Sequence, residues 1–124
     1  MSADERRPRW VYGEGTDPDP RFSLANERTA LAWVRTALAL VAGGVALTSL
    51  ATLADLPRML DVLAALACLT GGAVAVRAAV SWARVERSLR RGEHLPAPRT
   101  LGVLAVVVVA LALLLAGYAI GAAL

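Results

Sequence analysis

The chain has 124 residues, of which 57% are hydrophobic and 19% charged, and its mean hydropathy is +0.57. This composition is too apolar for a water-soluble domain of this length, which makes a membrane protein the expected class. The formal net charge is +3 and all 13 basic residues are arginines. Every cationic site therefore carries a planar guanidinium suited to two-point contacts with carboxylate or phosphate.

The first segment, residues 1–16, carries charges of both signs and two glycines, with little periodicity. It is predicted to be a flexible cytoplasmic tail, and because residues 1–30 lack an apolar stretch we expect no signal peptide. A helix is predicted to start after the turn at residues 17–20, with two candidate N-caps. Asp19 would place Pro20 at the first helical position, and Ser23 is the competing cap.

Three later segments reach the roughly 20 apolar residues that a helix needs to cross a membrane. They cover residues 31–54, 59–82 and 101–124, and the third carries no charge. We therefore predict an all-α membrane protein in which residues 17–124 form one domain of three transmembrane helices, with an amphipathic helical lead-in before the first.

The arginines are distributed unevenly around these spans, and this predicts the orientation of the chain. They gather before the first span and between the second and third, whereas the turn between the first two holds only Arg58. Loops rich in arginine stay in the cytoplasm, so we expect the N-terminus inside and the C-terminus outside the plasma (inner) membrane.

Three arginines lie where the first and second spans enter the membrane. Arg28 and Arg35 are seven residues apart and share one helical face. Arg77 lies at a similar depth in the antiparallel second span. An ionisable side chain at such depth is costly unless it finds a partner, so these three are predicted to bind an anion. The alternative is that they extend to the headgroups and mark the membrane border.

Four neighbouring side chains are predicted to support this site. Asn26, Thr29 and Trp33 fall on another face of the same helix, where they can bond to neighbouring helices. Glu27 lies between the two faces and can pair with an arginine of an adjacent helix or copy.

A second basic group follows the second span, on a predicted helical extension that ends at Gly92. It forms a cytoplasmic basic cluster of Arg84, Arg87, Arg90 and Arg91. Such clusters anchor anionic lipid, at about 1 kcal/mol for each basic residue. The alternative is an electrostatic funnel for polyanions in an oligomer.

Small residues predict helix packing and a homo-oligomer. The first span has Gly43 and Gly44 at its middle, and the second has a stripe containing Ala64, Cys68 and Gly72. Small side chains let membrane helices approach closely.

The residues that remain give no basis for catalysis. The single cysteine lies in mid-span, His94 lies in a charged loop, and no histidine, cysteine or carboxylate cluster has metal-ligand spacing. We expect no enzyme activity, no metal or other cofactor, and no nucleic-acid partner.

The residues around the first span also carry a family signature. Residues 19–21 (DPR), 24–29 (LANERT) and 31–40 (LAWVRTALAL) resemble that of the YidH-like membrane proteins, a family of unknown function. The resemblance covers residues 17–124. The run is also similar to the membrane domain of the eukaryotic vacuolar transporter chaperone subunits, which pass polyphosphate across a membrane.

This resemblance implies an oligomer that binds or conducts anions such as phosphate or polyphosphate through an arginine-lined cytoplasmic entrance. The alternative is a non-transporting structural or accessory subunit that binds anionic lipid headgroups and a partner protein.

Overall fold

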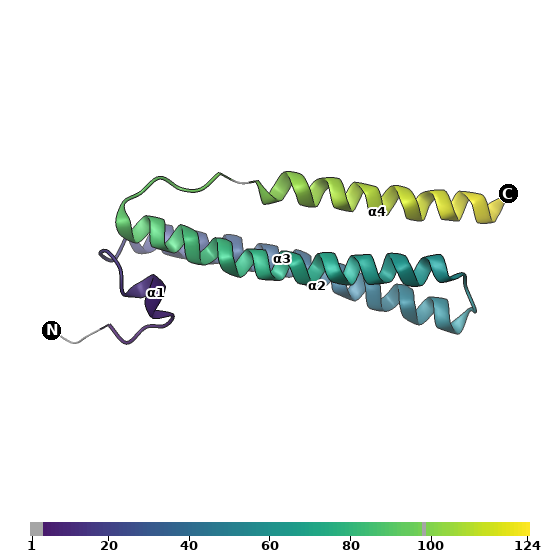
Figure 1. Cartoon of the computed structure of the whole chain (residues 1–124), viewed down its shortest axis with the longest axis horizontal. Coiled ribbons are helices and arrows are strands. Elements are labelled where there is room, and N and C mark those ends of the chain that lie inside the picture. The colour runs from purple at the N-terminus through teal and green to yellow at the C-terminus, as the bar shows by residue number, and fades with distance from the viewer. Residues whose placement is uncertain (1–3, 98) are drawn as a thin grey trace.

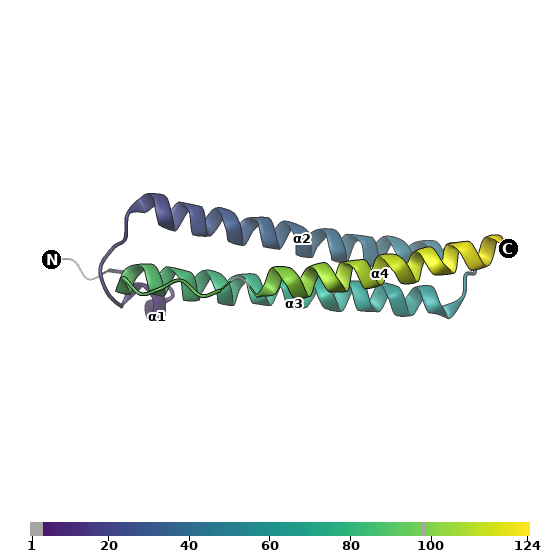
Figure 2. The same ribbon diagram turned by 90° about the horizontal axis from the view of Figure 1, so that it is seen from above.

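The computed structural model describes residues 4–97 and 99–124, and the regular elements of this part of the chain are all helices. They are α1 (Arg9–Tyr12), α2 (Pro20–Leu53), α3 (Arg58–Arg91) and α4 (Thr100–Ala123). The long helices α2 and α3 form an antiparallel hairpin, and α4 runs beside them (Figures 1 and 2). Each of these three is long and apolar enough to cross a membrane, which confirms the three predicted spans.

Helix α2 starts where the sequence predicts. The side chain of Asp19 accepts a hydrogen bond of 2.9 Å from the backbone N–H of Arg21, and Pro20 occupies the first turn. Asp19 is therefore the cap, and Ser23 instead bonds to α3. The predicted lead-in and first span form one continuous helix of 34 residues. At 1.5 Å per residue this helix is about 50 Å long, so it extends beyond a membrane core of about 30 Å.

Helix α3 also extends beyond its apolar segment and stops at the predicted glycine. Gly92 has a left-handed backbone with a φ of 66°, and its N–H returns to the carbonyls of Ser88 and Leu89. This is a helix C-cap that favours glycine. The arginine cluster on residues 84–91 is thus carried by the same rigid helix as Arg77.

The seam between α2 and α3 depends on two glycines. A Cβ added to Gly44 would lie 2.8 Å from the carbonyl oxygen of Ala64 and 2.5 Å from Cys68 Sγ, and one added to Gly71 would lie 2.8 Å from the carbonyl oxygen of Ala37. The predicted stripe is confirmed at Ala64 and Cys68. It is corrected at its next member, because Gly71 faces α2 whereas Gly72 has open space around it.

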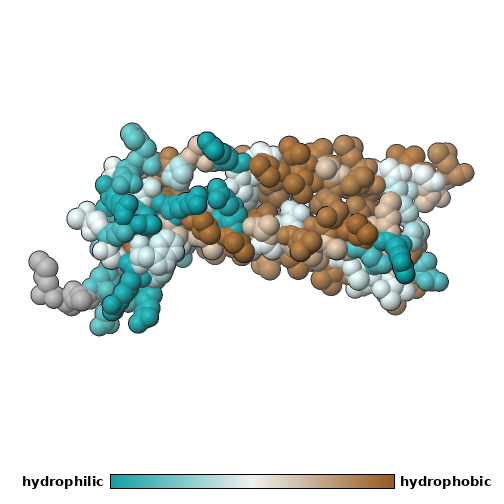
Figure 3. All heavy atoms as spheres, viewed as in Figure 1, coloured by the Kyte–Doolittle hydropathy of each residue, from teal (hydrophilic) through white to brown (hydrophobic). Residues whose placement is uncertain are grey.

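Helix α4 is joined to the hairpin much more loosely. None of its residues is buried, although Leu111 and Tyr118 pack against a small cluster of Ala51, Leu60 and Leu63. The space-filling view shows an apolar band between two polar ends, the larger one around α1 (Figure 3). An apolar exterior of this kind is what a membrane protein presents to lipid, since lipid tails are as apolar as its side chains.

The N-terminal segment contacts the hairpin. The first three residues lie outside the described part of the chain, but residues 4–17, which we call the strap, fold back onto the end of α3 near Gly92. Val11 in α1 is completely buried, and the backbone N–H of Thr16 donates to the carbonyl of Arg90 at 3.1 Å. The strap is therefore attached to the end of α3, because arginines of α3 bind its polar groups. The flexibility predicted for residues 1–16 stays a prediction.

Candidate anion-binding site

Polar contacts concentrate at the end of the hairpin where the strap lies, which we call the arginine-rich end. Glu86 of α3 is only 4% exposed. It accepts a hydrogen bond of 2.8 Å from Ser23 Oγ and a longer one of 3.4 Å from Asn26 Nδ2, which also donates to the carbonyl of Trp82 at 3.0 Å. These bonds fix the rotation of α2 against α3 at this end.

Arg90 is the main anchor of the strap, and it is 6% exposed. Its guanidinium donates to the carbonyl oxygens of Tyr12 and Glu14, at 2.9 and 2.8 Å, and to Asp17 Oδ1 at 2.6 Å. Its positive charge also faces the ring of Tyr12, with 5.6 Å between Cζ and the ring centroid. The buried charge of Arg90 is thus fully occupied within the chain.

The neighbouring arginines of α3 are paired with the strap as well. Arg87 Nη2 lies 2.9 Å from Glu14 Oε1, and Arg91 contacts the other oxygen of the same carboxylate. Burial acts to raise the pKa of Glu14, but hydrogen bonds and charges from Arg87 and Arg91 outweigh it and hold the pKa below its usual range. Hydrogen bonds from Arg6 and then Arg90 likewise hold the pKa of Asp17 below its usual range.

These pairings change the meaning of the predicted cytoplasmic basic cluster. Of its four members, Arg87, Arg90 and Arg91 are engaged by acidic side chains of the strap, while Arg84 is exposed and forms no ion pair with a residue that the structure describes. Two carboxylates of the strap, Glu14 and Asp17, therefore offset part of the charge of this cluster. Glu14 and Asp17 each lie 73 residues before an arginine that they contact.

A different set of arginines surrounds two adjoining cavities, which we call the basic cavities. The first, of about 180 Å³, is lined by α2, α3 and the start of α4, and its polar lining residues are Thr29, Trp33, Arg77, Ser81, Arg84 and Thr100. The second, of about 510 Å³, lies between α3 and α4 and has Thr70, Arg77, Arg99 and Thr100 as its polar lining residues. Arg77 and Thr100 belong to both.

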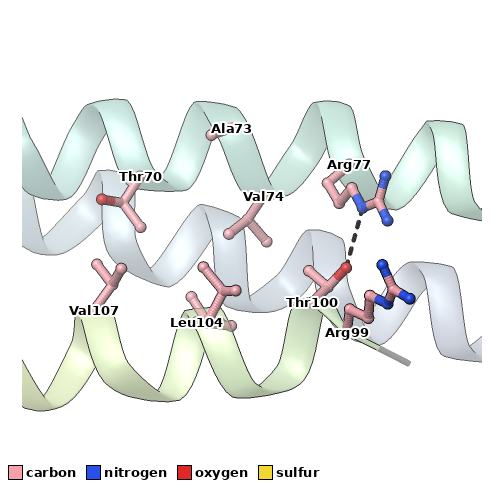
Figure 4. Close-up of a pocket in the computed structure, with 9 residues that line it drawn as sticks. Thr70, Ala73, Val74, Arg77, Arg99, Thr100, Leu104 and Val107 are labelled. Carbon is pink, nitrogen blue, oxygen red and sulfur yellow. Dashed lines mark hydrogen bonds between the residues drawn. The ribbon is translucent and has the colours of Figure 1, made fainter. Parts of the chain in front are cut away.

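Arg77 is held in a defined orientation between these cavities. Its Nε donates a hydrogen bond of 3.1 Å to Thr100 Oγ1, as Figure 4 shows, and the side chain of Arg99 lies beside it. Because Nε is engaged, the two terminal nitrogens remain available as a fork for an anion. No carboxylate is present among the described residues that line either cavity, so the positive charge there is not neutralised locally.

The structure does not bring the three predicted anion contacts together within one chain. Arg28 and Arg35 are exposed on α2, and Arg35 lies about 200° around the helix from Ala37, which faces α3. Neither lines a cavity with Arg77. An anion contact at Arg28 or Arg35 stays a prediction, whereas Arg77 lies in a cavity with the chemistry for one.

The predicted supporting residues are placed in three different ways. Asn26 joins α2 to α3 through Trp82 and Glu86. Thr29 and Trp33 line the smaller basic cavity. Glu27 lies on the other side of the hairpin and lines a separate cavity.

Several residues of this end were not predicted from the sequence. A signal existed for Glu86, the only carboxylate on the charged extension of α3 between Arg84 and Arg91. The positions of Arg99 and Thr100 carry no such signal, since they depend on how the loop after Gly92 returns α4 to the hairpin.

The comparisons place this architecture in a family. The sequence matches the family model described as Domain of unknown function (DUF202) over residues 21–88. The chain belongs to this family. It is 41% identical over 103 residues to inner membrane protein YidH of Escherichia coli, which covers 83% of this chain and 90% of that protein.

A second relative lies in another organism. An uncharacterized protein of Mycobacterium tuberculosis is 46% identical over 111 residues, covering 81% of this chain and 86% of that protein. No solved structure matches the chain. The family match and the three apolar helices identify this YidH-like chain as a multi-pass protein of the plasma (inner) membrane.

Proposed function

We propose that this protein is a non-enzymatic membrane protein that binds phosphate-bearing anions in the basic cavities. One observation supports this above all others. Arg77, Arg84 and Arg99 surround the two cavities, and no carboxylate among the described lining residues opposes them. Elsewhere on the same helix, arginines are paired with acids of the strap.

The donors of the basic cavities suit a phosphate group. A guanidinium can give two parallel hydrogen bonds to a phosphate, and such charge-assisted bonds are about twice as strong as neutral ones. Ser81 also lines the smaller cavity, and its hydroxyl can add a neutral donor, whereas the Thr29 hydroxyl donates to the carbonyl of Ala25 at 3.0 Å. Thr100 acts differently, since its hydroxyl holds the Arg77 guanidinium in place.

Two sources can supply this phosphate group. One is a soluble phosphate or polyphosphate, which the resemblance to the vacuolar transporter chaperone membrane domain suggests, and which an assembly of copies would conduct. The other is the headgroup of an anionic phospholipid, held by a structural or accessory subunit. The chemistry of the site is the same in both roles, so the experiment must separate the sources.

The test compares anion binding in nanodiscs made of zwitterionic lipid. Inorganic polyphosphate is titrated by calorimetry in one arm, and retained anionic phospholipid is counted by native mass spectrometry in the other. Whichever of the two ligands occupies the basic cavities, Arg77→Gln should weaken its binding by about tenfold or more. Hydrogen bonds to charged groups contribute about 1.5–3 kcal/mol. Arg77→Lys should retain part of it, because lysine keeps the charge but loses the fork.

Arg58→Gln is the matched control, since Arg58 is exposed at the opposite end of the hairpin. Thr100→Val should weaken binding less than Arg77→Gln, because it removes only the bond that orients the guanidinium. Equal binding by wild type and Arg77→Gln in both arms would reject the proposal. Polyphosphate flux in proteoliposomes then separates a conduit from an accessory subunit.

A further inference from the structure

Another cavity lies across the α2–α3 seam from the basic cavities, and carboxylates line it in place of arginines. It has a volume of about 330 Å³, and its polar and aromatic lining residues are Tyr12, Ser23, Glu27, Trp82 and Glu86. Ala78 lines both this cavity and the smaller basic cavity, which shows that they flank the same seam. We call it the acidic cavity.

The two carboxylates of the acidic cavity lack a cation. Glu86 is buried, and its hydrogen-bond donors are the neutral side chains of Ser23 and Asn26. Within the described part of the chain, no arginine forms an ion pair with Glu86 or Glu27, although several pair with the strap. A buried carboxylate is costly unless it is paired with a positive charge. The ring of Trp82 beside it is a favourable surface for a cation.

The chain also carries an arginine without an acidic partner among the described residues. Arg28 is exposed on α2 and has no ion pair with a described residue. It lies about 180° around α2 from Ala37, so it points away from α3 and cannot turn into its own chain's seam. Glu27, by contrast, lies on the side of the seam that borders the acidic cavity.

We infer that the acidic cavity receives the Arg28 side chain of a second copy of this chain. In a cyclic oligomer whose axis is normal to the membrane, each residue keeps its depth from one copy to the next. Arg28 is one residue from Glu27, or about 1.5 Å along the helix axis, and the bonds of Glu86 to Ser23 and Asn26 place that carboxylate nearby.

Depth also selects Arg28 over the other arginines on its face of α2. Arg21 and Arg35 are about 9 and 12 Å from Glu27 along the helix axis, so neither is level with it. Because Arg28 and Glu27 lie on different sides of α2, the contact joins unlike surfaces of the two copies. Repeated contacts of that kind close into a ring when the rotation permits. The basic cavities lie across the seam and take no part, so this inference does not depend on the proposed function.

The first test uses charge reversal, with oligomer mass measured in lipid nanodiscs by native mass spectrometry. Arg28→Glu and Glu27→Arg should each shift the protein to smaller species, with the oligomer fraction falling by about tenfold or more, as expected for a broken buried ion pair. The double variant should restore the oligomer, because both charges of the contact are then reversed and attract each other again. Arg58→Glu at the opposite end of the hairpin is the control and should assemble normally.

The second test does not require the reversed charges to fold. Copies with Arg28→Cys are mixed with copies carrying Glu27→Cys, all with Cys68→Ala, and treated with a short bifunctional thiol reagent. Mixed copies should cross-link much faster than either population alone. A monomeric wild type, failure of the double variant to reassemble, or equal cross-linking rates would each overturn the inference. The inference would also be overturned if both charge-reversal variants stayed oligomeric but lost a bound zwitterionic lipid. That result would assign the acidic cavity to a lipid headgroup.

Discussion

Helix α3 carries two groups of arginines within four turns, and the two groups differ in whether carboxylates lie beside them. Arg87, Arg90 and Arg91 meet the carboxylates of the strap. Arg77 and Arg84, joined by Arg99 from the next loop, line cavities without a carboxylate among their described lining residues. We call the first the paired group and the second the open group.

The comparison shows that a high density of arginine does not by itself locate an anion site. The paired group has the higher local density of positive charge in the sequence, and by that criterion it is the better candidate. In the folded chain the three arginines of the paired group share Glu14 and Asp17 of the strap, whereas no carboxylate is among the described residues that line the basic cavities. The difference between the two groups comes from acidic partners supplied by a distant segment of the chain. Four experiments test it.

The largest effect is expected for Arg90→Met, which keeps an unbranched side chain but removes the charge. It leaves the carbonyls of Tyr12 and Glu14 without their donor. The docking free energy of the strap should fall by about 2–4 kcal/mol, the range for disrupting a buried charged network. Amide hydrogen exchange of residues 9–16 reports this loss, and exchange in the centre of α2 should not change. Full protection of the strap in the variant would show that Arg90 is not its anchor.

A smaller loss of strap docking is expected for Gly15→Ala. Gly15 has a φ of 60°, and an added Cβ would overlap the carbonyl of Arg90. Left-handed strain in a non-glycine residue costs about 1–3 kcal/mol, so exchange protection of the strap should fall. Gly102→Ala is the control, since Gly102 has open space around it. Equal protection in both variants would mean that the strap does not need this close approach.

Glu14→Gln should convert part of the paired group into open arginines. Arg87 and Arg91 would lose their shared carboxylate, and each freed arginine should raise retention of anionic lipid by about fivefold at the membrane surface. Native mass spectrometry of nanodiscs with mixed lipids measures the change, and Asp55→Asn at the opposite end is the control. If retention does not rise, the strap does not mask the paired group.

The smallest effect is the pH dependence of strap docking near neutrality. The folded-state pKa values of Glu14 and Asp17, which contact arginines of α3, are below their usual range. Groups with lowered pKa values stabilise the docked strap above their ordinary pKa of about 4, and this contribution is lost as the pH falls through the lowered values.

The indole NMR signal of Trp10, which faces Arg87, should therefore stay constant from about pH 5 to 8 and shift only in stronger acid. A double variant, Glu14→Gln with Asp17→Asn, should lose this acid transition. A transition near neutrality in the wild type would contradict the assignment to these carboxylates.

Much of the fold follows from local features of the sequence. The stop at Gly92 and the three apolar spans each depend on residues within one or two turns, so composition and spacing were enough to place them. For the start of α2 the sequence offered two caps, and the structure selected Asp19 over Ser23. The stripe on α3 was predicted to within one residue, and only contact with α2 could show that Gly71 rather than Gly72 lies in the seam.

The candidate site was predictable in its chemistry but not in its membership. From the sequence, Arg77 is a functional candidate because a charge within an apolar helix needs a partner. Its grouping with Arg84, Arg99 and Thr100 depends on how the loop between α3 and α4 returns. A site that also includes Arg28 and Arg35 stays a prediction for an assembly of copies, because within one chain both lie on the side of α2 that points away from α3.

Composition and spacing are thus enough to identify a helical membrane protein with three apolar spans, whose basic side chains are those of arginine. Which arginines have an acidic partner is visible only in the folded chain, because the acids that pair with α3 come from a strap more than 70 residues earlier. Hydropathy and helix caps act over a few residues and can be read locally. Ion pairing depends on the distance between two charged groups in space. That distance is fixed only once the strap, α2 and α3 are packed together.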